Sequence, residues 1–356
     1  MKEKVVVGMS GGIDSFATAL LLRQKGYEVI GVNLVLWEEN DLAEMEEICR
    51  KLSIPLFRRD GRELFRKVVV KSFVDGYLSG YTPSPCCVCN SWIKWKLLLA
   101  SASELGAFSI ATGHYAGITE KQGLFYFRKG KDHQKDQSYF LWGVGQDILS
   151  RAHTPLGDYT KSEVRAWALT QGYGEIAGKR ESMGICFLKG RDYRDFIREN
   201  TAVSSGKGII FDRNGRAIGE HEGVLNYTIG QKRGMPVING QALYVAGMDA
   251  GQNVLIADVK SGLYTSILEV GDLNLQYIDD LFLPGLTVKV RGIGVNPEGG
   301  VKRVDIIPGG VRVHLSQPAW AVAPGQPVVF YWNDLLLGGG IVRKGRNEDF
   351  RQLQEM

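Results

Sequence analysis

The sequence predicts an α/β fold, with an open and mostly parallel sheet in the N-terminal part and two smaller β-rich domains behind it. Up to residue 112, short apolar runs alternate with segments of helical periodicity. After residue 204, the helical periodicity gives way to stretches rich in Gly, Val, Ile and Tyr. We therefore expect three domains, over residues 1–204, 205–267 and 268–356.

The first expected strand and helix flank a glycine-rich turn. Residues 5–7 are valines, and apolar residues at helical spacing run from residue 13 to residue 25, before Gly26. Glycines permit positive φ, and a helix N-terminus presents N–H groups, so this turn can bind a phosphate. An unliganded glycine turn is the alternative. The lysine of a Walker A loop is missing, which excludes an ordinary P-loop. The turn is Gly8-Met9-Ser10-Gly11-Gly12-Ile13-Asp14-Ser15.

Further strands and helices alternate along the same part of the chain. Ligands of an open parallel sheet bind beyond the carboxyl ends of its strands. The glycine turn, Asn33-Leu34 and Gly113-His114 all lie at such ends, which strengthens the prediction of a nucleotide site. The strands are expected over residues 27–34, 55–57 and 108–112, and the helices over 41–52, 64–78 and 94–105.

Turn signals and short apolar runs dominate the C-terminal part. Asp212-Arg213-Asn214-Gly215 predicts a β-hairpin. More strands are expected over residues 287–293, 303–307, 310–315 and 327–332.

Composition limits the classes of protein and the partners to be considered. A net charge of +4 over 356 residues permits a nucleic-acid partner without requiring one. No apolar run approaches the ~18 residues of a membrane span, and too few apolar residues precede the glycine turn for a signal peptide. We therefore expect a cytoplasmic protein without a membrane partner. Five cysteines, an odd number, do not form a disulfide framework and suggest catalysis or metal binding.

Three cysteines lie close together in the stretch Thr82-Pro83-Ser84-Pro85-Cys86-Cys87-Val88-Cys89-Asn90. A helix is expected to begin near Ser91, so its dipole would leave the Cys89 thiol partly ionised near neutral pH. Cys86 and Cys89 also have the spacing of metal ligands. No distinct role is expected for Cys87.

The other two cysteines are less informative. Cys49 lies on the apolar stripe of an expected helix and is interpreted as a core residue. Cys186 lies in a short apolar segment, where a buried structural role and a functional role both stay open. A structural zinc site would need a fourth ligand, and the available histidines show no fixed spacing: His114, His133 and His153.

Several motifs occur in an order that resembles one enzyme family. The glycine turn with Asp14 and Ser15 resembles the pyrophosphate-binding loop (PP-loop) of ATP pyrophosphatases. The complete ordered set is similar to the MnmA family of tRNA-specific 2-thiouridylases over about residues 4–341. It consists of residues 8–15, 82–90, 111–115, 135–141, 184–187, 227–231, 243–245 and 324–326.

The resemblance implies a fold and a reaction. The fold would be a PP-loop domain, a small central domain and a C-terminal β-barrel. The reaction would be adenylation of the 2-carbonyl of the wobble uridine of tRNA by ATP, followed by sulfur transfer that gives 2-thiouridine, AMP and pyrophosphate. Mg²⁺ would neutralise the ATP phosphates. The partners would be tRNA-Lys, tRNA-Glu and tRNA-Gln together with a sulfur-donor protein of unknown identity, and a disulfide bond is expected.

The resemblance also assigns roles to single residues. The catalytic residues would be Cys89 as nucleophile, Cys186 as carrier of a persulfide, and Asp14. ATP would be held by Gly8, Met9, Ser10, Gly11, Gly12, Ile13, Asp14, Ser15, Leu34 and Gly113. The target base would lie near Ser84, Pro85 and Cys86. The tRNA would be contacted by His114, Lys135, Asp136, Gln137, Arg291, Gly292 and Gln326.

The chain departs from the commonest family pattern in three places. Leu34 stands where many members have Met, Cys86 where many have Asp, and Trp92 where an acidic residue is usual. With Cys86, three thiolates (Cys86, Cys89 and Cys186) can hold a 4Fe-4S cluster with one open iron position. A Cys186 persulfide and a cluster-bound sulfide therefore both stay open as sulfur sources.

Basic residues gather on both sides of the expected site. As two clusters they predict a track for tRNA phosphates, whereas scattered surface charge is the default interpretation of each one. The clusters are Arg58, Arg59, Arg62, Arg66, Lys67 and Lys71, and Arg128, Lys129, Lys131 and Lys135.

Two other functions stay open. Another PP-loop ATP pyrophosphatase, such as an amide-forming ligase, would use the glycine turn but not the cysteines. A non-catalytic cysteine–metal module that binds RNA would leave the glycine turn without a role.

Overall fold

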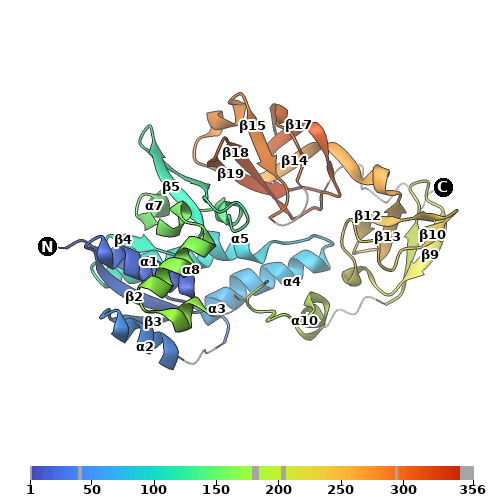
Figure 1. Ribbon diagram of the computed structural model, residues 1–356. Coiled ribbons are helices and arrows are strands. Elements are labelled where there is room, and N and C mark those ends of the chain that lie inside the picture. The colour runs from blue at the N-terminus through green and yellow to red at the C-terminus, as the bar shows by residue number, and fades with distance from the viewer. Residues whose placement is uncertain (1, 39–41, 179–183, 202–205, 293–295, 345–356) are drawn as a thin grey trace.

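The computed structural model describes residues 2–38, 42–178, 184–201, 206–292 and 296–344. Its N-terminal part is built on a five-stranded sheet in the order β3-β2-β1-β4-β7, in which every neighbouring pair is parallel. This arrangement confirms the predicted α/β class (Figure 1). The strands are β1 (Lys4–Gly8), β2 (Glu28–Val35), β3 (Leu56–Asp60), β4 (Ser109–Ala111) and β7 (Ala152–His153).

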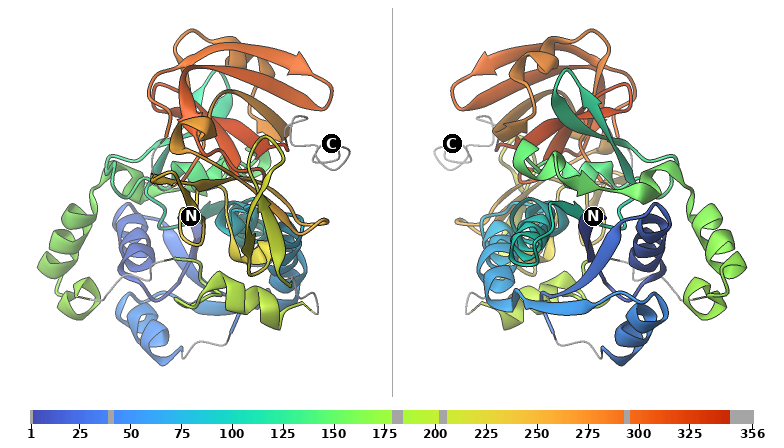
Figure 2. Two further views of the ribbon diagram at one scale, coloured as in Figure 1. Left: turned by 90° about the vertical axis from the view of Figure 1, so that its right-hand side faces the viewer. Right: turned by 90° about the vertical axis from the view of Figure 1, so that its left-hand side faces the viewer.

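Helices cover both faces of this sheet. Val5 and Val7 of β1 face one core and Val6 faces the other, as the two-residue period of a strand requires, and all three are fully buried. On the first face α8 lies beside α1 (Figure 2). The first face carries α1 (Ile13–Gln24), α2 (Ala43–Lys51), α8 (Lys161–Thr170) and α9 (Gly174–Ala177); the second carries α6 (Trp95–Glu104) and α7 (Gln146–Leu149).

The expected helices over residues 64–78 and 94–105 belong to longer helical segments that each contain a π-helical turn. The first runs through α3 (Arg62–Phe65), the π turn η1 (Arg66–Val70) and α4 (Lys71–Leu78). The second runs through α5 (Pro85–Cys89), the π turn η2 (Asn90–Lys94) and α6. The predicted helix start near Ser91 is therefore wrong. Pro85 occupies the first turn, where its missing N–H and fixed φ suit a helix start.

The central part is a four-stranded sheet in the order β12-β13-β8-β9. The predicted hairpin at residues 212–215 is confirmed, because β8 and β9 are antiparallel and Asp212 Oδ1 accepts from the N–H groups of Asn214 and Arg216. The elements are α10 (Tyr193–Glu199), β8 (Gly208–Phe211), β9 (Ala217–His221), β12 (Tyr244–Asp249) and β13 (Val254–Asp258), with a small hairpin of β10 (Val237–Ile238) and β11 (Gln241–Ala242).

The C-terminal part is an eight-stranded sheet that includes a hairpin from the N-terminal part, β5 (Ala116–Lys121) and β6 (Leu124–Lys129). β6 pairs with β19 at Arg128 and Leu335, a junction that the sequence analysis missed. This sheet lies beside the parallel sheet, and the central strands lie to one side (Figure 1). Its other strands are β14 (Tyr264–Leu275), β15 (Leu286–Lys289), β16 (Val301–Ile307), β17 (Gly310–Trp320), β18 (Pro327–Trp332) and β19 (Leu335–Val342).

The three domain ranges stay a prediction, and residue 268 lies inside β14. Across the ranges given above, no helix is both long enough and apolar enough to cross a membrane.

Trp95 is the largest side chain that the fold buries completely, and it packs on the rings of His114 and Phe127. Trp95→Ala should lower the free energy of unfolding by about 3–5 kcal/mol, because the cavity cannot collapse fully. Urea unfolding measures this loss. The control Phe108→Ala removes a ring that is 63% exposed, and should change stability by less than about 0.5 kcal/mol. Equal losses in both variants would contradict the assignment of Trp95 to the core.

Candidate functional site

The glycine turn lies at the carboxyl edge of the parallel sheet, between β1 and α1. Gly11 has a φ of +78°, which favours glycine, and Gly12 is the N-cap of α1. Ser15 holds the turn closed: its Oγ accepts from the Ser10 N–H at 3.1 Å and donates to the Gly12 carbonyl at 3.0 Å. Asn33, at the end of β2, donates to the Met9 carbonyl at 3.1 Å.

The ends of β2 and β4 border the same turn. Leu34 is half-buried in β2. Gly113, which follows β4, packs closely against α1. A Cβ added to this residue would lie 2.7 Å from the Asp14 backbone carbon. The predicted convergence of these segments at one sheet edge is therefore confirmed as a geometric fact, while their contact with ATP stays a prediction.

Asp14 is held by two side chains from distant parts of the chain. Lys161 Nζ contacts its two carboxylate oxygens at 2.6 and 2.8 Å, and the Tyr115 hydroxyl donates to Oδ1 at 2.9 Å. The Lys161 side chain is only 9% exposed, whereas that of Asp14 is 36% exposed. The site therefore presents a carboxylate at a helix N-terminus beside a buried ammonium group.

Sequence reasoning missed Lys161. The helix that carries Lys161 could have been predicted, because Thr160 and Glu163 form a capping box that marks the start of α8. The contact between Lys161 and Asp14, however, joins residues 147 positions apart and has no local pattern.

The cysteines differ strongly in exposure. Cys87 and Cys89 are buried, Cys86 is half-buried and Cys186 is exposed. Cys89 packs with Phe65 and Phe187 in one core, while Cys87 belongs to a different core. Cys49 is buried in the core of the first sheet face, as predicted.

Cys86, Cys89 and Cys186 form one electrostatic group. Burial raises the pKa of each thiol, to about 11 for Cys89, and the Lys94 ammonium opposes this rise in all three. Ionised Cys186 raises the pKa of both other thiols, so the three sulfurs lie within electrostatic reach of one another. The prediction that Cys89 is partly ionised by a helix N-terminus is wrong, because Cys89 is the last residue of α5 and is buried.

The cysteines and their described neighbours do not form a site for a single metal ion. In the described part of the chain, no group of three or more His, Cys, Asp or Glu side chains is placed to hold a metal ion. All five cysteines are free thiols. The described side chains as they stand therefore do not hold a single metal ion, and a cluster on Cys86, Cys89 and Cys186 stays a prediction.

The chain is similar to known proteins over most of its length. Residues 3–190 match the family model "tRNA methyl transferase HUP domain", residues 194–258 "tRNA methyl transferase PRC-barrel domain", and residues 285–342 "Aminomethyltransferase beta-barrel domain". The tRNA-specific 2-thiouridylase MnmA 3 of Bacteroides fragilis is 38% identical over 349 residues, which cover 97% of this chain and 95% of that relative. The chain belongs to the tRNA-specific 2-thiouridylase family.

Two further relatives match this chain over nearly its whole length. MnmA of Acetivibrio thermocellus is 37% identical over 359 residues, or 96% of this chain and 99% of the relative. MnmA of Acidithiobacillus ferrooxidans is 38% identical over 352 residues, or 96% and 98%. The resemblance inferred from the ordered motifs is thus confirmed.

The thiouridylase residues predicted to contact tRNA have internal partners. His114 is buried, shares a 2.7 Å hydrogen bond with the Thr112 hydroxyl and stacks on Trp95. Asp136 accepts from Lys289 Nζ at 3.1 Å, and Gln137 Oε1 accepts from the Tyr115 N–H at 3.0 Å.

The predicted contacts in the C-terminal sheet are also engaged. Gln326 Nε2 donates to the Thr82 carbonyl at 2.8 Å, and the Arg291 guanidinium bonds the Ala321 carbonyl beside Trp320. Gly292 is packed so tightly that a Cβ would lie 2.8 Å from the Tyr139 ring. In this structure these residues make contacts within the protein, and their contact with tRNA stays a prediction.

The two basic clusters are largely neutralised by acidic neighbours. In the first, Arg59 pairs with Glu104 at 2.7 Å and Lys71 pairs with Asp75. In the second, Lys131 pairs with Glu163 at 2.6 Å, and Arg128 pairs with Asp158. The phosphate track remains a prediction.

Burial, and secondarily the nearby Lys94 ammonium, lower the pKa of His114 well below its ordinary value. Unfolding returns this pKa to about 6.5, so the unfolded state binds the extra proton. The free energy of unfolding should therefore fall as the pH drops from 7 to 5, by up to about 1.4 kcal/mol per pH unit from this one group. His114→Gln should reduce that slope in urea unfolding. An unchanged slope would contradict a neutral buried His114, since His153 and His221 contribute equally to both proteins.

Proposed function

We propose that this chain is an ATP-dependent tRNA-uridine 2-sulfurtransferase. It adenylates the 2-carbonyl oxygen of the wobble uridine, releasing pyrophosphate, and then replaces that oxygen with sulfur, releasing AMP. One observation carries the proposal. A glycine turn anchored through Asp14, and a group of three mutually interacting thiols, Cys86, Cys89 and Cys186, lie in one member of the thiouridylase family.

ATP would lie at the carboxyl edge of the sheet. The phosphates would face the turn at residues 8–15, and the adenine would pack near Leu34 and Gly113. Asp14 and Lys161 would together orient the turn, with the lysine compensating the carboxylate near a phosphate. Mg²⁺ would enter with the nucleotide, since this ion is usually held by phosphates, waters and one or two carboxylates.

Sulfur would arrive as a persulfide on Cys186, the exposed thiol of the group. Its outer sulfur attacks C2 of the adenylated base, and AMP leaves with the electrons of the C–O bond. The Cys89 thiol then loses its proton to solvent, which the Lys94 ammonium assists by opposing the rise of its pKa. The thiolate attacks the Cys186 sulfur, so that the bond to the transferred sulfur breaks. The base keeps that sulfur, and a Cys89–Cys186 disulfide forms. An external thiol reductant restores both thiols before the next turnover.

A cluster is the second candidate for the sulfur source, because Cys86 would supply a third thiolate beside Cys89 and Cys186. A 4Fe-4S cluster held by Cys86, Cys89 and Cys186 would supply sulfide directly. Anaerobic purification with iron and sulfide analysis separates the two candidates. A colourless, iron-free and fully active enzyme excludes the cluster.

The partners follow from the same proposal. The tRNA substrates would be tRNA-Lys, tRNA-Glu and tRNA-Gln, and Ser84, Pro85 and Cys86 would lie near the target base. Arg58, Arg62 and Arg66 would guide tRNA phosphates, and charge reversal at these three positions tests that guidance through the salt dependence of tRNA binding. A sulfur-donor protein would load Cys186 in the cytoplasm.

Cys186→Ala should abolish 2-thiouridine formation while AMP release from ATP and tRNA continues, because only the sulfur carrier is lost. The assay combines ATP, a persulfide donor and unmodified tRNA, followed by nucleoside analysis. Cys49→Ala, which removes a thiol of the distant core, should retain thiolation. Thiolation by Cys186→Ala would refute the carrier role, and AMP release by the parent enzyme without any thiolation would favour an amide-forming ligase.

Lys161→Met should lower the rate of AMP formation on the order of 10²-fold, because Asp14 and the glycine turn lose their anchor near the reacting phosphate. The matched control is Lys51→Met, which removes an exposed lysine paired with Glu47 at 2.9 Å. Rates of AMP formation that are equal in the two variants would show that the Asp14–Lys161 pair does not position ATP.

A further inference from the structure

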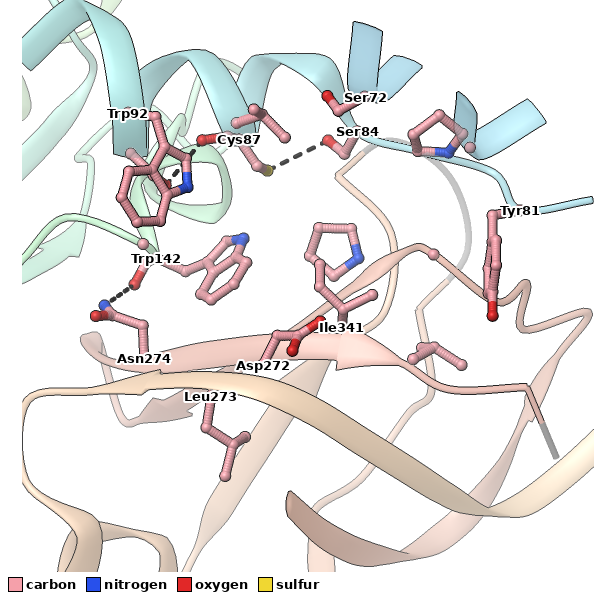
Figure 3. Close-up of a pocket in the computed structure, with 18 of the residues that line it drawn as sticks. Ser72, Tyr81, Ser84, Cys87, Trp92, Trp142, Asp272, Leu273, Asn274 and Ile341 are labelled. Atoms are coloured by element: carbon pink, nitrogen blue, oxygen red, sulfur yellow. Dashed lines mark hydrogen bonds between the residues drawn. The ribbon is translucent and has the colours of Figure 1, made fainter. Parts of the chain in front are cut away.

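The helical segment formed by α5 and η2 has a second face, opposite the one that carries Cys86 and Cys89. Ser84, Cys87, Val88, Ser91 and Trp92 share this face by their helical spacing. They line a cavity of about 1150 Å³ between this segment and strands β14 and β19 of the C-terminal sheet (Figure 3).

The cavity contains a buried hydrogen-bond donor that lacks a strong acceptor among the described residues. Trp142 is 8% exposed, and its Nε1 has no oxygen or nitrogen acceptor in the described structure. The Asn274 side chain fixes the backbone of Trp142, because its Nδ2 donates to the Trp142 carbonyl at 2.9 Å. The Cys87 sulfur lies close enough to interact with the Trp142 side chain, but a protonated thiol is a weak acceptor, and burial raises the pKa of Cys87 to about 12. Buried N–H groups are nearly always satisfied, so this one indicates an absent acceptor.

A strained residue brings a carboxylate to the same space. The register of β14 against β19 shifts between Gly271 and Asn274, and Asp272 within this bulge has a φ of +48°. Bulges beside binding sites commonly re-aim a side chain. Figure 3 shows the Asp272 carboxylate and the Trp142 indole facing the same cavity. The cavity thus presents an acceptor and a donor from two different domains.

Trp92 adds an aromatic surface to the donor and the acceptor of the cavity. Trp92 lines the cavity and is 58% exposed, and Lys96 Nζ lies 4.2 Å from its ring centroid. One face of the indole thus carries a cation, and more than half of the residue's surface is open to a stacking partner. A stacking surface, a donor and a carboxylate acceptor match a nucleobase that has a ring acceptor beside an amino group.

We propose that this cavity binds one unpaired nucleobase of the RNA substrate, distinct from the uridine that is modified. The base stacks on Trp92, accepts from Trp142 Nε1 and donates its amino group to Asp272. This inference rests on the proposed function, which supplies an anticodon loop. The cavity and the reactive cysteines lie on opposite faces of one helix about 10 Å wide, so neighbouring loop nucleotides can reach both. Adenine, cytosine and guanine fit, whereas uracil lacks the amino group.

The test is a double-mutant cycle between the protein and the RNA. The probe is an unmodified anticodon stem–loop RNA, together with copies that carry one abasic nucleotide at each loop position. Dissociation constants are measured by quenching of tryptophan fluorescence and by filter binding. Trp92→Ala should weaken binding of the parent RNA about tenfold, in the range found for lost base–aromatic stacking. One abasic RNA should bind the unaltered protein about tenfold more weakly than the parent RNA does. With the Trp92→Ala protein, this abasic RNA and the parent RNA should have equal dissociation constants.

Two further variants make the test specific. Asp272→Asn keeps a side chain that tolerates positive φ, and should weaken binding of the parent RNA but not of that same abasic RNA. Phe108→Ala removes another exposed aromatic ring with a cation above it, Arg151 at 4.8 Å, and should leave every dissociation constant unchanged.

The outcomes separate this inference from the proposed function. If no loop position is coupled to Trp92 and Asp272 while the unaltered enzyme forms 2-thiouridine, the nucleobase site is refuted and the function stands. If the unaltered enzyme forms no 2-thiouridine, the proposed function fails regardless of the binding cycle. Coupling at a uridine alone would overturn the role of Asp272 as acceptor from an amino group.

Discussion

The ion pair between Asp14 and Lys161 is the contact on which the part of the molecule around the glycine turn depends. It joins the first turns of α1 and α8 across the edge of the sheet. The lysine is held through its backbone as well, because Asp132 Oδ2 accepts the Lys161 N–H at 2.9 Å. A buried ammonium without a partner would be strongly unfavourable, and a carboxylate in the first turn of a helix is favoured by the dipole. Each charge therefore offsets the cost of burying the other, and together they hold in place the helix that follows the glycine turn.

A second constraint ties the C-terminal sheet to the loop in front of the cysteines. The Thr82 N–H donates to the Pro324 carbonyl, and its own carbonyl accepts from Gln326 Nε2, both at 2.8 Å. Gly325 between them has a φ of +87°, and a Cβ there would lie 2.8 Å from Tyr81 Cβ. The position of Cys86 and Cys89 thus depends on a turn that lies more than two hundred residues later in the chain.

Local patterns were sufficient to predict the parallel sheet, the hairpin at residues 212–215 and the convergence of the glycine turn with Leu34 and Gly113. Strand period, turn residues and the edge rule for parallel sheets are all properties of short segments. The ionisation of Cys89 was predicted wrongly, because its burial depends on Phe65 and Phe187 from other elements. For the same reason the sequence did not reveal the partner of Lys161, the pairing of β6 with β19, or the internal partners of His114 and Gln326. Each of these depends on which distant segments meet.

The helical segment from Pro85 to Lys94 connects these constraints. Its π turn lets Asn90 Nδ2 reach the Phe140 carbonyl at 3.1 Å and brings the Lys94 ammonium toward the three thiols. Cys89 packs toward Phe187 on one side, and Cys87 packs toward Tyr139 on the other. A π turn adds one residue to the helical repeat and so rotates the residues after it, which is why such turns are frequent at functional sites. The same short helix thereby supports the proposed sulfur transfer on one face and the proposed nucleobase cavity on the other, and Ser84 before it borders both sites.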